Sequence, residues 1–370
     1  MESDPLRIHI VTDKFNRGGG IEHIYQISKG ITNVNFGIFA ENGNAKDKFE
    51  GLDNVKVYDK GFNPEYVLEK RPDIVHIHHL RPLLSFFKNP FAKYNIPIIF
   101  TVHGLHIHKY EFSKSLKKRV KYLLRFNLEK NVLKKIDRVI AVSKEDTIFL
   151  QEKYKLKNVT YLTNGIDFSK INISNKSKID LREGMNLLSD HFLFVTVARF
   201  DFQKGYDVLI RAIYFLKDFI KNRKVKFIFV GKGDKFEEMK KLSEKLSVSE
   251  YIHFFGERKD VYNIIRCSDC FILPSRWEGL PIVLIEAGFL KVPVIASDTY
   301  GNREIIRKEN GFLFENQNIE DLSENIKKVI EHKNYLNKYS ENLFQEVKKN
   351  YNIENMISGI KQIYFSFKKG

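Results

Sequence analysis

The chain has 370 residues, of which 43% are hydrophobic, and its formal net charge is +16. The hydrophobic share excludes a disordered chain, and the length predicts two domains of about 150–200 residues each rather than one core. No run reaches the ~18 apolar residues of a membrane span. The start, Met1–Pro5, carries acidic residues where a signal peptide needs basic ones, so we expect a cytoplasmic protein.

The basic charge favours an anionic partner, which could be a phosphate group, nucleic acid or an acidic membrane face. A Lys-rich surface that only maintains solubility is the alternative. Cys267 and Cys270 directly precede an apolar segment, and no second Cys pair is present to complete a zinc site. We interpret them as buried, idle thiols in a reducing compartment.

In the first half of the chain, short apolar runs alternate with helical patterns. This alternation predicts a parallel sheet covered by helices on both faces. Residues 7–11 are expected to form a strand, residues 13–20 a glycine-rich loop and residues 21–29 a helix. The further strands expected here are residues 35–40, 55–58, 74–77, 98–102, 138–142 and 159–162.

A polar stretch around residues 169–183 lacks a strong period and predicts a linker. We therefore divide the chain into a first domain at 1–170, a linker at 171–186 and a second domain at 187–352. The second series has expected strands at 193–198, 226–230, 252–254, 270–273 and 294–296, and helices at 207–222, 236–246 and 280–290. Two doubly wound domains in tandem predict a deep cleft between them, with ligands at the carboxyl ends of the strands.

The strongest motif is Arg276–Glu286, which follows the expected strand that ends at Leu273. Pro281 suits the first turn of a helix, whose free amides would hold a phosphate. Glu278 and Glu286 lie on either side of that turn and can reach different parts of one elongated ligand. An amphipathic helix with a solvated Glu286 is the alternative.

A second motif, Arg199 to Gly205, follows the expected strand 193–198. Arg199 and Lys204 are two cations on a loop at a strand's carboxyl end, where a diphosphate would bind. An exposed basic loop is the alternative.

Glycine-rich turns follow two other strands, at Gly18–Gly20 and Gly231–Gly233. Glycine lets the backbone approach a ligand and leaves amides free to point at it. Neither turn has the spacing G-x-G-x-x-G, which disfavours a nicotinamide cofactor.

Six of the eleven histidines fall between His76 and His108. His76 and His78 face the same way on a strand, so a zinc or iron site is conceivable, but no Asp or Glu pattern completes it. His103 lies at the end of another strand, facing the expected cleft. The sequence contains no Asp-x-Asp, the pair that commonly holds a divalent metal ion beside a diphosphate. We therefore expect no metal and no cofactor. Positive side chains and the amino end of a helix would neutralise the diphosphate instead.

Together these motifs resemble the retaining glycosyltransferases of family 4, which have the GT-B fold. The resemblance covers most of the chain in the family's order. It is carried by Gly18–Glu22, Pro72–His76, Thr101–Gly104, Asn164–Asp167, Arg199 with Lys204–Gly205, Gly231–Gly233, Phe255–Gly256, Leu273–Ser275, Glu278–Glu286, Pro293–Ala296 and Asn310–Gly311. A third Gly in the first loop and Tyr300 depart from the pattern.

The resemblance implies the site. His103, Arg199, Lys204 and Glu278 would be catalytic: His103 and Glu278 would contact the donor sugar, while Arg199 and Lys204 would grip the diphosphate. Glu286 would hold the ribose. The other donor-binding residues would be Gly19, Gly20, Gly231, Arg258, Gly279, Leu280, Ile282 and Val283. The periodic tail at 353–370 would cross back to the first domain.

The resemblance implies retaining, metal-independent transfer of a hexose or N-acetylhexosamine from a nucleotide-sugar, with a UDP-sugar favoured over a GDP-sugar. The acceptor would be a glycan or a lipid-linked molecule in the synthesis of cell-surface polysaccharide or glycolipid. A nucleotide-sugar 2-epimerase of the same fold is an alternative. A basic nucleic-acid-binding protein is disfavoured because no RNA-binding motif is present, so we expect no nucleic-acid partner.

The segment Lys109–Arg138 carries eleven Lys or Arg against three acids, with apolar residues interleaved. Such a helix can lie on an anionic membrane, which would place the protein peripherally on the inner face of the cell membrane. A helix that packs one face on the sheet and solvates its basic face is the alternative. The apolar residues are Phe112, Leu116, Val120, Leu123, Leu124, Phe126 and Leu128.

Overall fold

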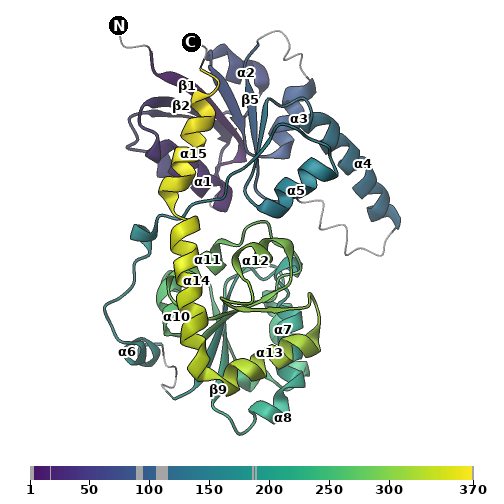
Figure 1. Ribbon diagram of the computed structural model, residues 1–370, viewed down its shortest axis with the longest axis vertical. Coiled ribbons are helices and arrows are strands. Elements are labelled where there is room, and N and C mark those ends of the chain that lie inside the picture. The colour runs from purple at the N-terminus through teal and green to yellow at the C-terminus, as the bar shows by residue number, and fades with distance from the viewer. Residues whose placement is uncertain are drawn as a thin grey trace. The chain divides into compact units, whose positions relative to one another are not determined.

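The computed structural model describes residues 4–16, 18–88, 95–105, 116–185, 187 and 190–368. The chain divides into two compact units (Figure 1). The first holds the described residues up to Gly165 together with those from Ile353 onward, and the second holds Ile166–Asn352.

The first unit contains a parallel sheet in the order β3-β2-β1-β4-β5-β6-β7. Its inner strands are buried on both faces because helices cover both sides of the sheet, whereas the edge strands β3 and β7 are partly exposed. The strands are β1 (Leu6–Lys14), β2 (Val34–Glu41), β3 (Val55–Tyr58), β4 (Ile74–Ile77), β5 (Ile98–Val102), β6 (Arg138–Ala141) and β7 (Val159–Tyr161). The helices are α1 (Gly19–Gly30), α2 (Pro64–Glu69), α3 (Leu80–Lys88), α4 (Leu116–Leu133), α5 (Lys144–Glu152) and α15 (Ile353–Phe365).

The second unit contains a parallel sheet in the order β10-β9-β8-β11-β12-β13. Its strands are β8 (Phe192–Val197), β9 (Val225–Val230), β10 (Ile252–Gly256), β11 (Cys270–Leu273), β12 (Val294–Ser297) and β13 (Phe312–Phe314). Its helices are α6 (Lys178–Glu183), α7 (Tyr206–Phe215), α8 (Lys217–Ile220), α9 (Phe236–Lys245), α10 (Val261–Cys267), α11 (Ile282–Phe289), α12 (Tyr300–Ile305), α13 (Ile319–Glu331) and α14 (Leu336–Asn350). Two parallel, helix-flanked sheets confirm the predicted pair of Rossmann-like domains.

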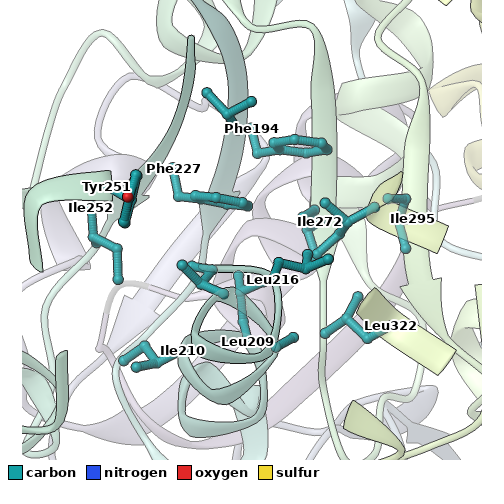
Figure 2. Close-up of a cluster of buried hydrophobic side chains, with 14 of the residues drawn as sticks. Phe194, Leu209, Ile210, Leu216, Phe227, Tyr251, Ile252, Ile272, Ile295 and Leu322 are labelled. Carbon is teal, nitrogen blue, oxygen red and sulfur yellow. The ribbon is translucent and has the colours of Figure 1, made fainter. Parts of the chain in front are cut away.

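Apolar side chains from one face of the second sheet pack against α7. Figure 2 shows Phe194 of β8 and Phe227 of β9 above Leu209 and Leu216, and all four are buried. Leu322 brings α13 into the same cluster. This core fixes the strands rigidly, so the loops at their carboxyl ends start from defined positions.

The tail prediction is confirmed, since α15 packs against α1 of the first unit although α14 belongs to the second (Figure 1). At Gly30, a Cβ would lie 2.2 Å from Ile357 Cδ1, so the two helices meet where glycine leaves room. Tyr364, fully buried, donates or accepts a hydrogen bond at His76 Nδ1.

The predicted linker at 171–186 is wrong as a free connection. Residues Lys178–Glu183 form α6, which Ser177 and Asp180 start with a reciprocal capping box. Arg182 is buried and donates to Asp269 and to the carbonyl of Cys267. The segment is therefore tied to the second unit by these hydrogen bonds together with the buried side chain of Leu181.

Two smaller differences concern the second unit. The expected helix at 207–222 is interrupted at Leu216 and becomes α7 and α8. The short strand β13, Phe312–Phe314, was not predicted because three residues carry too little periodicity. Cys267 and Cys270 are buried and unpaired, as expected, and burial raises the pKa of the Cys267 thiol to about 11.

Candidate functional site

The order of the strands decides where each unit can bind a ligand. In the second unit β8 lies between β9 and β11, so chain connections leave it in opposite directions. A crevice opens at the carboxyl ends of strands at such a point. The loop after β8 carries Arg199 and Lys204, and the loop after β11 carries Glu278.

Lys204 and Glu278 form the centre of this edge. The Lys204 ammonium donates to Glu278 Oε1 at 2.6 Å, and the two side chains are 16% and 6% exposed. Ser275 Oγ donates to the same oxygen at 2.6 Å. Gln203 Nε2 donates to the carbonyl of Trp277 at 2.8 Å and lies 3.5 Å from Glu278 Oε2. The two loops therefore meet at this pair, and hydrogen bonds hold the carboxylate in one orientation.

A partly buried ion pair fixes the two loops to each other. Arg276 donates through both terminal nitrogens to Asp207, at 2.9 and 2.6 Å, and also donates to the Phe202 carbonyl. Its guanidinium lies 4.1 Å from the centroid of the Phe202 ring. Arg276 is 5% exposed while the Asp207 side chain is 33% exposed, so the pair is partly shielded from water and joins the loop after β11 to the loop before α7 and to α7 itself.

Glycine is required where the backbones of these loops meet. Gly205 has φ of 65°, and a Cβ there would lie 2.0 Å from the carbonyl oxygen of Pro274. Gly231, with φ of 141°, would place a Cβ 1.9 Å from the carbonyl oxygen of Ala198. Both glycines therefore permit close packing of the loops after β8, β9 and β11.

Arg199 lies on the surface of the same loop. Its side chain is 73% exposed and contacts Asp201 at 3.2 Å. It is therefore a mobile cation beside the edge rather than a member of the buried network. Arg258, after β10, donates to both oxygens of Asp260 at 2.8 and 2.7 Å.

Glu286 is held apart from the pair, in the middle of α11. Burial raises the pKa of its carboxyl, and a hydrogen bond from Tyr262 of α10, 3.2 Å long, opposes that rise. The Glu286 side chain is half-buried, and a carboxylate with one hydroxyl donor has further oxygen lone pairs available to a ligand. The solvated Glu286 weighed above is excluded.

The start of α11 differs from the prediction. Pro281 has ψ of 98° and precedes the helix, which begins at Ile282. Gly279 and Leu280 therefore belong to the loop, and Ile282 and Val283 supply the first amides of the helix. The carbonyl of Gly279 lies where a Cβ on Gly301 would sit, so α12 supports this loop closely.

In the first unit, β1 lies between β2 and β4, which gives the same kind of carboxyl edge. Gly19 and Gly20 open α1 directly after β1. A Cβ on Gly20 would lie 3.6 Å from His79 Cε1, an ordinary contact, so Gly20 lies beside the histidines that follow β4. Thr12 Oγ1 holds His79 Nδ1 at 2.7 Å.

His103 lies at this edge after β5 and belongs to a group of histidines. Its Nε2 is 2.9 Å from Nδ1 of His78, and their rings are 5.2 Å apart. The ring of His23, from α1, stands edge-on to His103 at 4.9 Å. Burial lowers the pKa of His23 to about 4, with a smaller opposing effect from Asn164, and lowers the pKa of His78 well below its usual value.

His76 plays a different part from the metal ligand considered above. Its two ring nitrogens are 2.7 Å from Tyr364 Oη and Thr101 Oγ1, so both are taken. His106 and His108 lie outside the described residues.

Four residues of the site were not singled out from the sequence as functional: Ser275, Gln203, Tyr262 and His23. Ser275 belongs to the motif Leu273–Ser275 named above, so its role could have been found from the sequence. Nothing in the sequence near Tyr262 indicates its contact with α11.

Two family models match the chain. "Glycosyl transferases group 1" matches residues 177–346, and "Glycosyltransferase Family 4" matches residues 61–170. A curated relative is the UDP-Gal:α-D-GlcNAc-diphosphoundecaprenol α-1,3-galactosyltransferase of Escherichia coli, 29% identical over 80% of this chain and 76% of that protein. The putative glycosyltransferase EpsD of Bacillus subtilis is 30% identical over 65% of this chain and 63% of its own length.

Solved structures share the fold over nearly the whole chain. HepE of Anabaena, crystallised in complex with UDP, superposes with a TM-score of 0.82 at 20% identity and covers 98% of this chain and all of its own. A glycosyltransferase from Rickettsia africae gives a TM-score of 0.79 at 21% identity, covering both chains completely. Among the residues that the structure describes, no helix has the length and apolar character needed to cross a membrane.

Proposed function

The chain belongs to the group 1 glycosyltransferases, with a GT-B fold of the family-4 type, and on that premise we propose that it transfers a hexose or N-acetylhexosamine with retention, from a UDP-sugar to a glycan or lipid-linked acceptor. The observation that carries the proposal is the buried Lys204–Glu278 pair at the carboxyl edge of the second sheet. The pair offers a cation for a diphosphate and a fixed carboxylate for sugar hydroxyls side by side.

Departure of the diphosphate is the demanding step, because negative charge builds up on the leaving oxygen. In our proposal Lys204, Arg199 and the first amides of α11 bear that charge without a metal ion. The exposed Arg199 can move onto a bound phosphate, since it is 73% exposed and its ion pair with Asp201 lies at the surface. The acceptor attacks from the face that the diphosphate leaves, and a donor oxygen takes its proton, so no side-chain nucleophile is required.

Two carboxylates would orient the donor. Glu278, already oriented by Ser275, accepts hydrogen bonds from sugar hydroxyls, and Glu286, held by Tyr262, accepts them from the ribose. Gly231 and Arg258 would border the nucleotide, and Gly19, Gly20 and His103 of the first unit would contact the donor phosphates and sugar. UDP is favoured because the E. coli relative is named for UDP-Gal and HepE was crystallised with UDP.

The donor is tested by incubating the purified chain with a panel of UDP- and GDP-sugars and measuring free nucleotide released by slow hydrolysis. We expect one UDP-sugar to release UDP and to raise the melting temperature. Conversion of the donor into another nucleotide-sugar without release would instead identify the 2-epimerase. Nucleotide release that requires manganese and stops with a chelator would contradict the metal-independent mechanism.

We also propose that α4 docks the protein on an anionic membrane, where a lipid-linked acceptor resides. One side of α4 packs on the sheet through Tyr122 and Phe126. The opposite side exposes Val120, Leu123, Leu124 and Leu128, with exposed fractions of 46–67%. The alternative, a helix that only packs one face on the sheet, therefore explains the inner apolar face of α4 but not the outer one. Lys121 and the lysines that follow the helix supply positive charge near the exposed face. Lys109 and Phe112 of the predicted segment lie outside the described residues.

A further inference from the structure

Three histidines of the first unit converge although they come from different elements. His23 lies on α1, His78 follows β4 and His103 follows β5. One nitrogen from each ring lies within 4.8 Å of the others. The parallel sheet causes this convergence, because β1, β4 and β5 end at the same edge and α1 starts there.

Hydrogen bonding within the described residues leaves part of this group unexplained. Neither ring nitrogen of His23 makes a hydrogen bond of good geometry, although the Asn164 side chain lies near enough to oppose the fall in its pKa, and Nε2 of His78 has no partner among the described residues. His23 and His78 are 6% and 2% exposed. Burying polar atoms without partners is unfavourable, so a cluster of them calls for a ligand.

From this arrangement we propose that His23, His78 and His103 form a transition-metal site that takes Zn²⁺. Imidazole nitrogen is a preferred ligand of zinc, at about 2.0–2.1 Å, and three imidazoles with one open position form a known type of site. Nitrogens on a tetrahedral ion lie about 3.4 Å apart, so shifts of roughly 1 Å would close the group around the ion.

Access and the fourth position come from a neighbouring cavity. A cavity of about 80 Å³ is lined by His78 and His103 together with Thr101, Gly104 and Leu105. Water occupies about 30 Å³ in the liquid, so the cavity has room for a metal-bound water. His76 stays outside the group because Tyr364 and Thr101 occupy its nitrogens.

The site has a consequence that rests on the proposed function. His103 is expected to contact the donor sugar, and a zinc ion on its ring would withdraw it. Zinc would then inhibit the transferase, whereas the diphosphate chemistry in the second unit proceeds without metal. Zinc binding and catalysis are therefore measured separately.

Binding is measured on the full chain after chelator treatment and dialysis. Zn²⁺ is titrated against a chromophoric competitor, and Co²⁺ is added as a probe whose visible absorption reports tetrahedral coordination. We expect one ion per chain, and at least ~10-fold weaker binding in each of the variants His23→Gln, His78→Gln and His103→Gln. The matched control is His253→Gln, a histidine of β10 in the second unit, and it should bind as the parent does.

X-ray absorption on the zinc-loaded, unsubstituted chain keeps the test independent of how the variants fold. Three imidazoles in the coordination shell support the proposal, and a shell of oxygen or sulfur overturns it. Equal zinc affinity in the parent and the three variants also overturns it. Donor hydrolysis is then followed with and without zinc. Zinc bound by three imidazoles without any inhibition would uphold the site and count only against the role of His103 in the reaction.

Discussion

Lys204 Nζ and Glu278 Oε1 lie 2.6 Å apart in the second unit, on loops that follow two neighbouring strands. Before a donor binds, the cation is therefore neutralised by the carboxylate. In the proposed mechanism a diphosphate would share or take over Lys204, while sugar hydroxyls would take over Glu278. The pair is thus a site already arranged for a ligand that carries both groups.

Replacing Lys204 with Ala should lower kcat by about 10²–10³-fold, because a charge-stabilising donor is lost from the departing diphosphate. Lys224→Ala is the control, since Lys224 pairs with Asp190 next to the start of β9, away from the carboxyl edge. Turnover of the preferred UDP-sugar is the measurement. A Lys204→Ala enzyme as fast as the control would remove the basis of the mechanism.

The same pair should be strongly coupled in stability. Lys204→Met leaves a 6% exposed carboxylate without its cation and should cost about 3 kcal/mol of unfolding free energy. Glu278→Gln in the same chain should recover much of this loss, because no buried charge then lacks a partner. A double-mutant cycle by urea unfolding gives the coupling, and additive costs would show that the pair is not a unit.

Glu286→Gln should stabilise the free protein and weaken nucleotide binding. Burial raises the pKa of this carboxyl, so the ionised form opposes folding above the pKa of the unfolded chain. The gain should be about 1 kcal/mol, or ~2–4 °C in Tm, at pH 7–8 and should vanish near pH 4. UDP should bind at least ~10-fold more weakly, as measured by calorimetry. The Tyr262→Phe variant should lose affinity to a smaller extent, since the carboxylate remains.

His9 should make the first unit sensitive to acid. Burial lowers its pKa to about 4, against a hydrogen bond to the Val67 carbonyl, with smaller effects from Arg7 and Asp73. A histidine whose pKa is lower in the folded state contributes stability above pH 6.5 that is lost as the pH falls towards 4, by up to about 3 kcal/mol. His9→Asn, which retains a donor, should lower the number of protons taken up on unfolding by about one. That number is read from the slope of the unfolding free energy against pH. Identical slopes over pH 7 to 4.5 would contradict this.

Membrane docking should depend on the outer apolar face of α4. Leu123→Gln with Leu124→Gln should abolish flotation with anionic liposomes, and the unsubstituted chain should float at low salt and much less at high salt. Tyr214→Gln with Phe215→Gln is the matched control, because these two residues are also adjacent, apolar and exposed, on α7. Absence of flotation at low salt in the unsubstituted chain would end the docking proposal.

The sequence predicted the inner strands well because they are buried on both faces of each sheet. Residues 74–77, 98–102 and 270–273 are such strands with the predicted bounds, and the partly exposed edge strand at 55–58 has its predicted bounds as well. Continuous apolar runs mark such strands, and glycine turns mark their ends. Where the signal came from hydrogen bonds rather than apolar pattern, as at α6, the prediction of a linker was wrong.

The candidate site divides in the same way. Arg199, Lys204, Glu278 and Glu286 could be named in advance because each stands within a few residues of a predicted strand or helix end. Their partners could not, since contact between Ser275 and Glu278 is a matter of loop conformation and contact between Tyr262 and Glu286 depends on how α10 packs against α11.

The sequence by itself determined the alternation of strands and helices and the polar residues at the strand ends. It could do so because hydrophobic periodicity and the residue types of turns are local properties of the chain. Only the tertiary structure decided which strand ends are neighbours. Strand order follows from the packing of helices on the two faces, and it alone brings Lys204 to Glu278 and gathers His23, His78 and His103 from distant parts of the chain.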